Sequence, residues 1–77
     1  NKVSIFPNPS RDFIRIHLEK DLMEKIELYS VTGQLIFEAG LKSNTFILNT
    51  ANYPSGTYIL KVLNQKHGSI NTKFIKE

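Results

Sequence analysis

Apolar and polar residues alternate with a period of two in short segments along most of this 77-residue chain. Successive side chains of a β-strand point to opposite faces, so this alternation is typical of strands that bury one face. The clearest case is the segment Phe13 to Leu18. Its buried face would hold Ile14, Ile16 and Leu18. Glycine, proline, asparagine and serine, which favour turns, separate the segments. The pattern predicts an all-β fold.

Seven segments, spaced by about ten residues, are predicted to be strands. They are Val3 to Phe6, Phe13 to Leu18, Lys25 to Ser30, Leu35 to Ala39, Thr45 to Asn49, Thr57 to Leu63 and Ile70 to Lys76. This spacing is typical of a seven-stranded immunoglobulin-like antiparallel β-sandwich, and a small barrel is the alternative. We expect Thr57 to Leu63 at the centre of a sheet, because both of its faces are apolar. Two segments are expected outside the strands: a helical turn within Glu19 to Glu24, capped by Asp21, and a polar loop over Gly40 to Asn44.

Turn residues at fixed positions delimit these strands. Pro7 and Pro9 cannot donate to a β-ladder, so they end the first strand. Gly33 supplies the positive φ of a tight hairpin, which predicts antiparallel pairing of the segments on either side of it. Pro54 and Gly56 shape the turn before the strand that contains Tyr58. We expect Tyr58 in the core with its hydroxyl bonded to a turn, as in the tyrosine corner of related sandwiches.

The length and the cysteine count restrict how the chain is stabilised. A chain of 77 residues is expected to form a single domain over residues 1–77, because it is too short for two hydrophobic cores. It has no cysteine, so neither disulfides nor thiol chemistry contribute. No apolar run reaches the roughly 18 to 20 residues that span a bilayer, so no membrane span is expected. Because it begins at Asn1 without a methionine, we expect it to be a fragment of a longer protein.

The net charge of +3 is concentrated near the C-terminus. Residues 1–60 carry six basic and six acidic side chains, whereas residues 61–77 carry Lys61, Lys66, Lys73 and Lys76 against Glu77. Such a basic tail favours an acidic receptor groove, nucleic acid or an anionic membrane surface as a partner. A solvated sheet edge is the alternative. Nucleic-acid binding is not expected, because the candidate stacking residues Tyr29 and Tyr53 are separated from the tail.

No motif of catalysis or metal binding is present. His17 and His67 lack metal-ligand spacing, and Gly33, Gly40, Gly56 and Gly68 occur singly rather than in a phosphate loop. The carboxylates that would have to form an acid/base pair fall on predicted loops or outward positions: Glu19, Asp21, Glu24, Glu27 and Glu38. No serine has a GxSxG setting. The chain is therefore predicted to be a structural or recognition module, not an enzyme, and to need no cofactor or metal.

Four signatures carry a resemblance to a known family. They are Phe6-Pro7-Asn8-Pro9, Ile26 to Gly33, Tyr53-Pro54-Ser55-Gly56-Thr57-Tyr58 and Lys73-Phe74-Ile75-Lys76. In their order and spacing the chain resembles the type A C-terminal sorting domains of proteins exported by the type IX secretion system, over essentially all of its length. Tyr53 stands where the family more often has leucine, and Phe6 where tyrosine is common. Both substitutions keep an apolar anchor.

The resemblance implies a seven-stranded sandwich at the C-terminus of a larger secreted protein. Such domains direct their cargo through the outer membrane by binding the secretion machinery. A sortase-like peptidase then usually removes them, and the cargo is anchored to surface lipopolysaccharide or released. We expect recognition at the last strand, through Lys73, Phe74, Ile75 and Lys76, with Pro7, Asn8, Pro9, Gly33, Pro54, Gly56 and Tyr58 as structural residues. An appended adhesion or carbohydrate-binding sandwich, with Tyr29 and Tyr53 as its aromatic platform, is the alternative.

Overall fold

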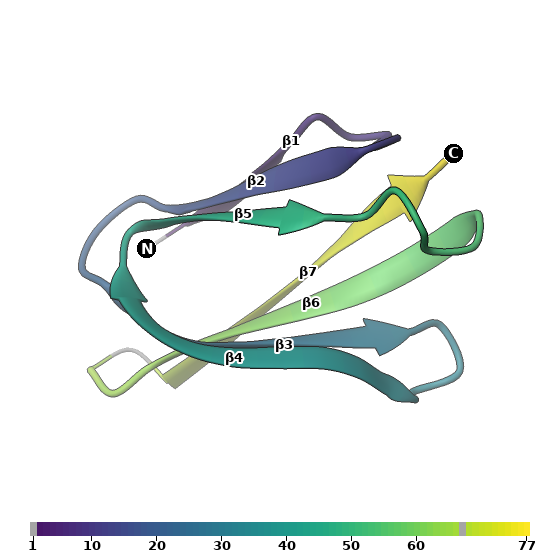
Figure 1. Ribbon diagram of the computed structural model, residues 1–77. Coiled ribbons are helices and arrows are strands. Elements are labelled where there is room, and N and C mark those ends of the chain that lie inside the picture. The colour runs from purple at the N-terminus through teal and green to yellow at the C-terminus, as the bar shows by residue number, and fades with distance from the viewer. Residues whose placement is uncertain (1, 67) are drawn as a thin grey trace.

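A computed structural model describes residues 2–66 and 68–77 and shows seven strands, with no helix in these two ranges (Figure 1). The strands are β1 (Val3–Phe6), β2 (Phe13–Leu18), β3 (Met23–Ser30), β4 (Leu35–Ser43), β5 (Thr45–Asn49), β6 (Gly56–Asn64) and β7 (Gly68–Lys76). All seven predicted strands are present. The β3, β4, β6 and β7 strands are longer than the alternation alone predicts.

The strands form two antiparallel sheets that face each other (Figure 1). One sheet has the order β1-β2-β5 and the other the order β4-β3-β6-β7. The predicted β-sandwich is confirmed, and its strand order is compatible with an immunoglobulin-like topology. In the seven-stranded constant-type arrangement the fourth strand belongs to the same sheet as the first, second and fifth strands, whereas here β4 pairs with β3 in the other sheet. The β6 strand lies between β3 and β7, so its predicted central position is also confirmed.

The core lies between the inner faces of the two sheets. The inward residues of β2 are Ile14, Ile16 and Leu18, as predicted, and all three are fully buried. Opposite them, the larger sheet contributes a second set of buried residues: Met23, Ile26, Leu28, Tyr58, Leu60, Val62 and Phe74. Burying one large apolar side chain contributes about 1.5–3 kcal/mol. Because the chain has no disulfide, this packing is the main source of its stability.

The prediction of a helical turn within Glu19 to Glu24 is wrong. The segment forms an extended turn in which Asp21 has a φ of 67°, and β3 already begins at Met23. A register shift between Met23 and Lys25 brings the Met23 side chain into the core. The bulge interrupts the period of two, so alternation read from Lys25 onward does not reveal this burial.

The prediction of a polar loop over Gly40 to Asn44 is also wrong. The β4 strand continues to Ser43, because Leu41 follows Phe37 and Ala39 on the side that packs against the core. Gly40 lies within the strand opposite Lys25 and has no positive φ. The chain then passes from one sheet to the other across Asn44, whose carbonyl accepts a hydrogen bond from Leu18 N at 2.9 Å.

Candidate functional site

The four sequence signatures meet at one end of the sandwich, on the right in Figure 1. The start of β6 lies beside the end of β7, since Gly56 pairs with Lys76 and Tyr58 with Phe74. Tyr58 also pairs with Ser30, the last residue of β3. We call this region the motif end and define it as residues 6–11, 30–34, 53–58 and 74–77. Turns that are far apart in the sequence therefore form one continuous part of the molecule.

The loop around Pro7 and Pro9 is fastened to the last strand by three hydrogen bonds. Asn8 Oδ1 accepts from Ile75 N at 3.0 Å, and Ser10 N donates to Ile75 O at 2.7 Å. Glu77 N in turn donates to Ser10 O at 2.9 Å. The peptide bonds before both prolines are cis. Ser10 forms a parallel bridge with Lys76, so this loop acts as a short additional strand at the end of β7.

An aromatic stack holds the turn 53–58 against the end of β7. The Tyr58 hydroxyl donates to Pro54 O at 2.6 Å, which confirms the predicted bond between this side chain and a turn. The ring centroids of Tyr58 and Phe74 are 5.5 Å apart with nearly parallel planes, and the ring of Tyr53 packs 5.8 Å from Tyr58. Burial raises the pKa of Tyr53 above its ordinary value. This stack couples the third signature to the fourth.

The hairpin turn after β3 and the turn before β6 border a shared cavity of about 300 Å³. Gly33 has a φ of 91° and donates from its backbone N to Ser30 O at 2.9 Å, as a tight hairpin requires. Val31 and Ile36 line the cavity from the hairpin, and Pro54 lines it from the other turn. Sequence reasoning missed Val31 and Ile36 as exposed apolar residues, although both are adjacent to a recognised turn.

The alternation of β7 separates the four candidate recognition residues into two pairs. Phe74 and Lys76 point to the inner side, with 1% and 8% of their surface exposed. Lys76 Nζ donates to Glu77 O at 3.0 Å. Lys73 and Ile75 point outward, and Ile75 is 50% exposed. A partner that approaches the outer face of this sheet therefore meets Lys73 and Ile75, whereas Phe74 and Lys76 support the strand from within.

In the part of the chain that the structure describes, the β7 strand lies at an edge of its sheet, and β6 is the strand of that sheet beside it. Lys73 pairs with Ile59 of β6, and Asn71 with Lys61. An open depression of about 380 Å³ lies beside this edge and is lined by Ile59, Asn71, Thr72 and Lys73. A strand at a sheet edge has backbone groups that no neighbouring strand uses, and these are accessible to a partner.

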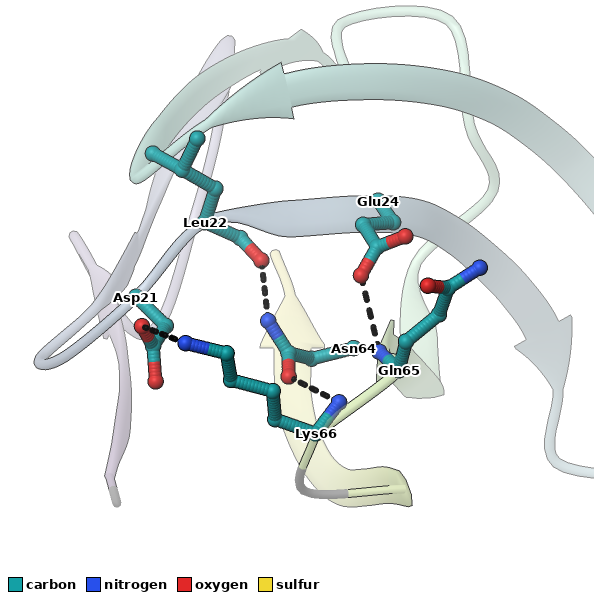
Figure 2. Close-up of polar contacts among 6 residues, drawn as sticks. All are labelled: Asp21, Leu22, Glu24, Asn64, Gln65 and Lys66. Atoms are coloured by element: carbon teal, nitrogen blue, oxygen red, sulfur yellow. Dashed lines mark hydrogen bonds and ion pairs between the residues drawn. The ribbon is translucent and has the colours of Figure 1, made fainter.

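The opposite end of the sandwich holds a polar cluster that joins two loops (Figure 2). Asn64 Nδ2 donates to Leu22 O, and Asn64 Oδ1 accepts from Lys66 N at 2.8 Å. Gln65 N donates to Glu24 Oε2 at 2.8 Å. Lys66 Nζ lies 3.9 Å from Asp21 Oδ1. These bonds connect the β2–β3 turn to the end of β6, so the carboxylates of Asp21 and Glu24 serve a structural role.

The other chemically interesting side chains do not converge. His17 is exposed and lies 3.1 Å from Thr45 Oγ1, and His67 falls outside the described residues. Glu27 accepts a hydrogen bond from the Tyr29 hydroxyl at 3.0 Å, which lowers the pKa of this carboxyl and raises the pKa of Tyr29. In ranges 2–66 and 68–77, no group of three or more histidine, cysteine or acidic residues is arranged to hold a metal ion.

The tyrosines proposed as a carbohydrate-binding platform do not lie on one surface. Tyr29 alternates with the buried Leu28 and lies on the outer side of the larger sheet. Tyr53 instead packs against the core through Tyr58. Stacking on a sugar needs aromatic faces presented together, so this arrangement does not favour the alternative function.

The fold and the site define a small recognition module: a β-sandwich whose signatures are joined at one end and whose last strand lies at an edge. The chain belongs to the family of secretion system C-terminal sorting domains, whose family model matches residues 4–77. This confirms the resemblance carried by the four signatures. Membership of this type IX family marks a protein for export across the outer membrane, to the cell surface or the extracellular space.

Two curated relatives share this region. The chain is 32% identical over 74 residues to ulvan lyase NLR42 of Nonlabens ulvanivorans, which covers 95% of this chain and 14% of that protein. It is 27% identical over 74 residues to an endo-acting ulvan lyase of Formosa agariphila, with the same two coverages. The chain thus spans about one seventh of the length of these relatives.

In the described ranges, no helix is long and apolar enough to cross a membrane.

Proposed function

We propose that residues 1–77 form one C-terminal sorting domain of a larger secreted protein and that this domain has no catalytic role. It delivers an upstream cargo domain to the type IX secretion machinery. A sortase-like peptidase then removes the domain, and the cargo is attached to the cell surface or released. The observation that carries the proposal is the family match over residues 4–77. Since the similarity to the two lyases is restricted to 14% of their length, it carries no proposal about the cargo.

The secretion machinery recognises the domain by binding its last strand, β7. Of the four residues Lys73, Phe74, Ile75 and Lys76, the outward pair Lys73 and Ile75 makes the contact, and the buried pair maintains the strand. Lys61 lies on the neighbouring strand, two residue pairs from Lys73 along the ladder and on the same face of the sheet. Because Lys61 lies opposite Glu27 of β3, the edge residue Lys73 is the main positive charge offered to a partner. It favours an acidic partner, since complementary charges accelerate association and exclude wrong partners.

Export of a fused reporter in a host with the type IX machinery tests this function. A secreted reporter that carries residues 1–77 at its C-terminus should reach the medium or the cell surface, whereas the same reporter without them should remain in the periplasm. Export of the reporter without the domain would contradict the proposed function. Mass spectrometry of the exported reporter tests the peptidase step, because the mature protein should lack residues 1–77.

A charge reversal tests the contact at Lys73. Lys73→Glu should lower export at least tenfold, while Lys42→Glu serves as the matched control, since Lys42 is an exposed lysine on β4 at the other edge of the same sheet. Both variants should retain the melting temperature of the unchanged domain. Equal export of the two variants would show that Lys73 is not part of the contact.

A further inference from the structure

The ladder between β6 and β7 determines which backbone groups of β7 face the open edge. Ile75 uses both its N–H and its C=O to bind the loop around Asn8 and Ser10, so both groups point away from β6. In an antiparallel ladder, opposed pairs alternate between hydrogen-bonded and non-hydrogen-bonded. The register of β7 on β6 has no shift from Gly56–Lys76 to Asn64–Gly68. The backbone N–H and C=O groups of Ser69, Asn71 and Lys73 therefore also point away from β6.

Only the end of this edge is covered by the domain itself. The loop residues Asn8 and Ser10 pair with Ile75 and Glu77 and extend the sheet by one parallel bridge. Among the described residues, no comparable backbone bond reaches Ser69, Asn71 or Lys73. A row of backbone donors and acceptors at a sheet edge is a template for another strand. The domain thus completes its own edge at the motif end and leaves the preceding stretch open.

The two edges of the larger sheet differ in regularity. The β4 edge is interrupted, because its pairing with β3 shifts between Met23 and Lys25 and again between Leu28 and Tyr29. Such bulges twist an edge and oppose strand addition. The β7 edge has continuous register, and proline and acidic residues are absent from Ser69 to Lys73. Of these two edges, β7 is therefore the one suited to accept a strand.

Side chains around the open stretch specify the chemistry of the added strand. The open depression lined by Ile59, Asn71, Thr72 and Lys73 lies beside the edge and offers a mainly apolar surface to a side chain of the added strand. Lys73 and Lys61 project on the same outer face, from the residue pairs Ile59–Lys73 and Lys61–Asn71, which are two steps apart along the ladder. Because successive residues of a strand alternate between faces, an apolar and an acidic residue separated by one position would both lie over this outer face.

We propose that the stretch Ser69 to Lys73 binds an extended, acidic peptide segment of a protein partner by strand addition to the β7 edge. The inference rests on the proposed function, in which the partner is a component of the secretion machinery. Ser69, Asn71 and Lys73 supply one backbone donor and one acceptor each, which give affinity independent of the cargo. The depression beside Ile59 and the charge of Lys73 select the segment. The loop at Asn8 and Ser10 limits how far the added strand extends towards the C-terminus.

Proline at an outward position of the edge tests the inference. Asn71→Pro removes the N–H that faces the partner, whereas no ladder bond to β6 is lost, so the domain should still fold. Asn71→Thr is the matched control, since it changes the side chain and keeps the N–H. Fused to the secreted reporter, Asn71→Pro should reduce export at least tenfold relative to Asn71→Thr, with both domains shown to be folded by thermal unfolding.

Each outcome of this experiment bears on the inference separately from the proposed function. If residues 1–77 are needed for export but folded Asn71→Pro is exported as well as Asn71→Thr, strand addition is overturned and the sorting function stands. If Asn71→Pro fails to fold, Ser69→Pro replaces it in the experiment, because the backbone N–H of Ser69 faces the same edge. If both proline variants unfold, hydrogen exchange of the unchanged domain decides: slow exchange of the Ser69, Asn71 and Lys73 amides would show that they are bonded within the domain and would overturn the inference, whereas fast exchange supports it.

Discussion

Asn8 and Ile75 are 67 residues apart in the sequence, and the side-chain oxygen of Asn8 accepts a hydrogen bond from the backbone N of Ile75 at 3.0 Å. This bond, with the two backbone bonds of Ser10, connects the first signature of the chain to the last. It gives Asn8 a role that its flanking prolines do not indicate. The Pro-Asn-Pro segment fixes the end of the strand that we propose as the recognition element.

Removing the Asn8 acceptor should loosen the end of β7. We expect Asn8→Ala to lower the free energy of unfolding by about 1 kcal/mol, which is the usual net contribution of one hydrogen bond. Asn8→Asp keeps the acceptor and should change stability much less. Urea unfolding of the isolated domain measures both, and an equal loss for the two variants would argue against a role of this bond.

The ring and the hydroxyl of Tyr58 should make separate contributions to the free energy of unfolding. Tyr58→Phe keeps the stack on Phe74 and loses the bond to Pro54 O, so unfolding should become easier by about 1 kcal/mol. Phe74→Ala empties part of the core and should cost about 3–5 kcal/mol, enough to unfold much of a small domain. Thermal unfolding followed by circular dichroism distinguishes them. A stability of Phe74→Ala close to that of Tyr58→Phe would contradict the assignment of Phe74 to the core.

Two glycines should differ in their tolerance of alanine. A Cβ at Gly33 would meet nothing within 4 Å, but the φ of 91° is strained for any L-residue, so Gly33→Ala should cost about 1–2 kcal/mol. Gly40 has no positive φ, and its nearest neighbour for a Cβ is Glu24 O at 3.9 Å. Gly40→Ala should therefore be neutral or slightly stabilising. Chemical denaturation of both variants checks this order, and a larger loss for Gly40→Ala would reverse it.

Two buried hydroxyls, that of Ser10 in the motif end and that of Thr50 directly after β5, should be replaceable. Ser10 Oγ and Thr50 Oγ1 are buried and have no hydrogen-bond partner. An unsatisfied buried polar group costs about 1–3 kcal/mol, so its removal relieves a penalty. We expect Thr50→Val, which preserves shape, and Ser10→Ala to leave the melting temperature unchanged or to raise it. A clear decrease in either variant would show that the hydroxyl is bonded in solution, for example to an ordered water molecule.

The Glu27–Tyr29 pair should contribute to acid sensitivity. The Tyr29 hydroxyl, followed by Lys25, holds the pKa of Glu27 below its ordinary value in the folded protein. A lowered pKa in the folded state stabilises the fold above the unfolded pKa, and this stabilisation is lost as the pH falls through the folded pKa. In Tyr29→Phe the pKa of Glu27 should move up towards its ordinary value. NMR titration of the Glu27 side chain measures this shift, and an unchanged pKa would refute the role of the hydroxyl.

The sequence predicted all seven strands, but it did not predict the limits of β3 and β4, whose pairing contains register shifts. The inward residues Ile14, Ile16 and Leu18 follow from alternation, because the side-chain direction in a strand depends only on local geometry. Met23 was missed, since a register shift separates it from the alternating residues of β3. Leu41 was missed because Gly40 suggested a turn, whereas packing against the core keeps this segment extended.

In the candidate site, too, some features follow from local alternation and others depend on the tertiary structure. Alternation in β7 already places Lys76 with Phe74 on the inner side, a consequence that the sequence-based prediction of Lys73 to Lys76 as one recognition element did not use. The open edge at Ser69, Asn71 and Lys73 has no comparable local signal. It depends on the position of β7 at the edge of its sheet, beside β6, and on how far the Asn8 loop extends along that edge.

By itself, the sequence determined the all-β class, the core-facing residues of most strands, the hairpin at Gly33 and the family of the chain. These properties depend on local periodicity, on turn residues and on motifs in order. The tertiary structure alone decided that the four signatures meet at one end, that Asn8 binds Ile75, and which backbone groups of β7 remain open. Those relationships join residues far apart in the chain, and they are fixed by strand pairing and core packing rather than by local conformational preference.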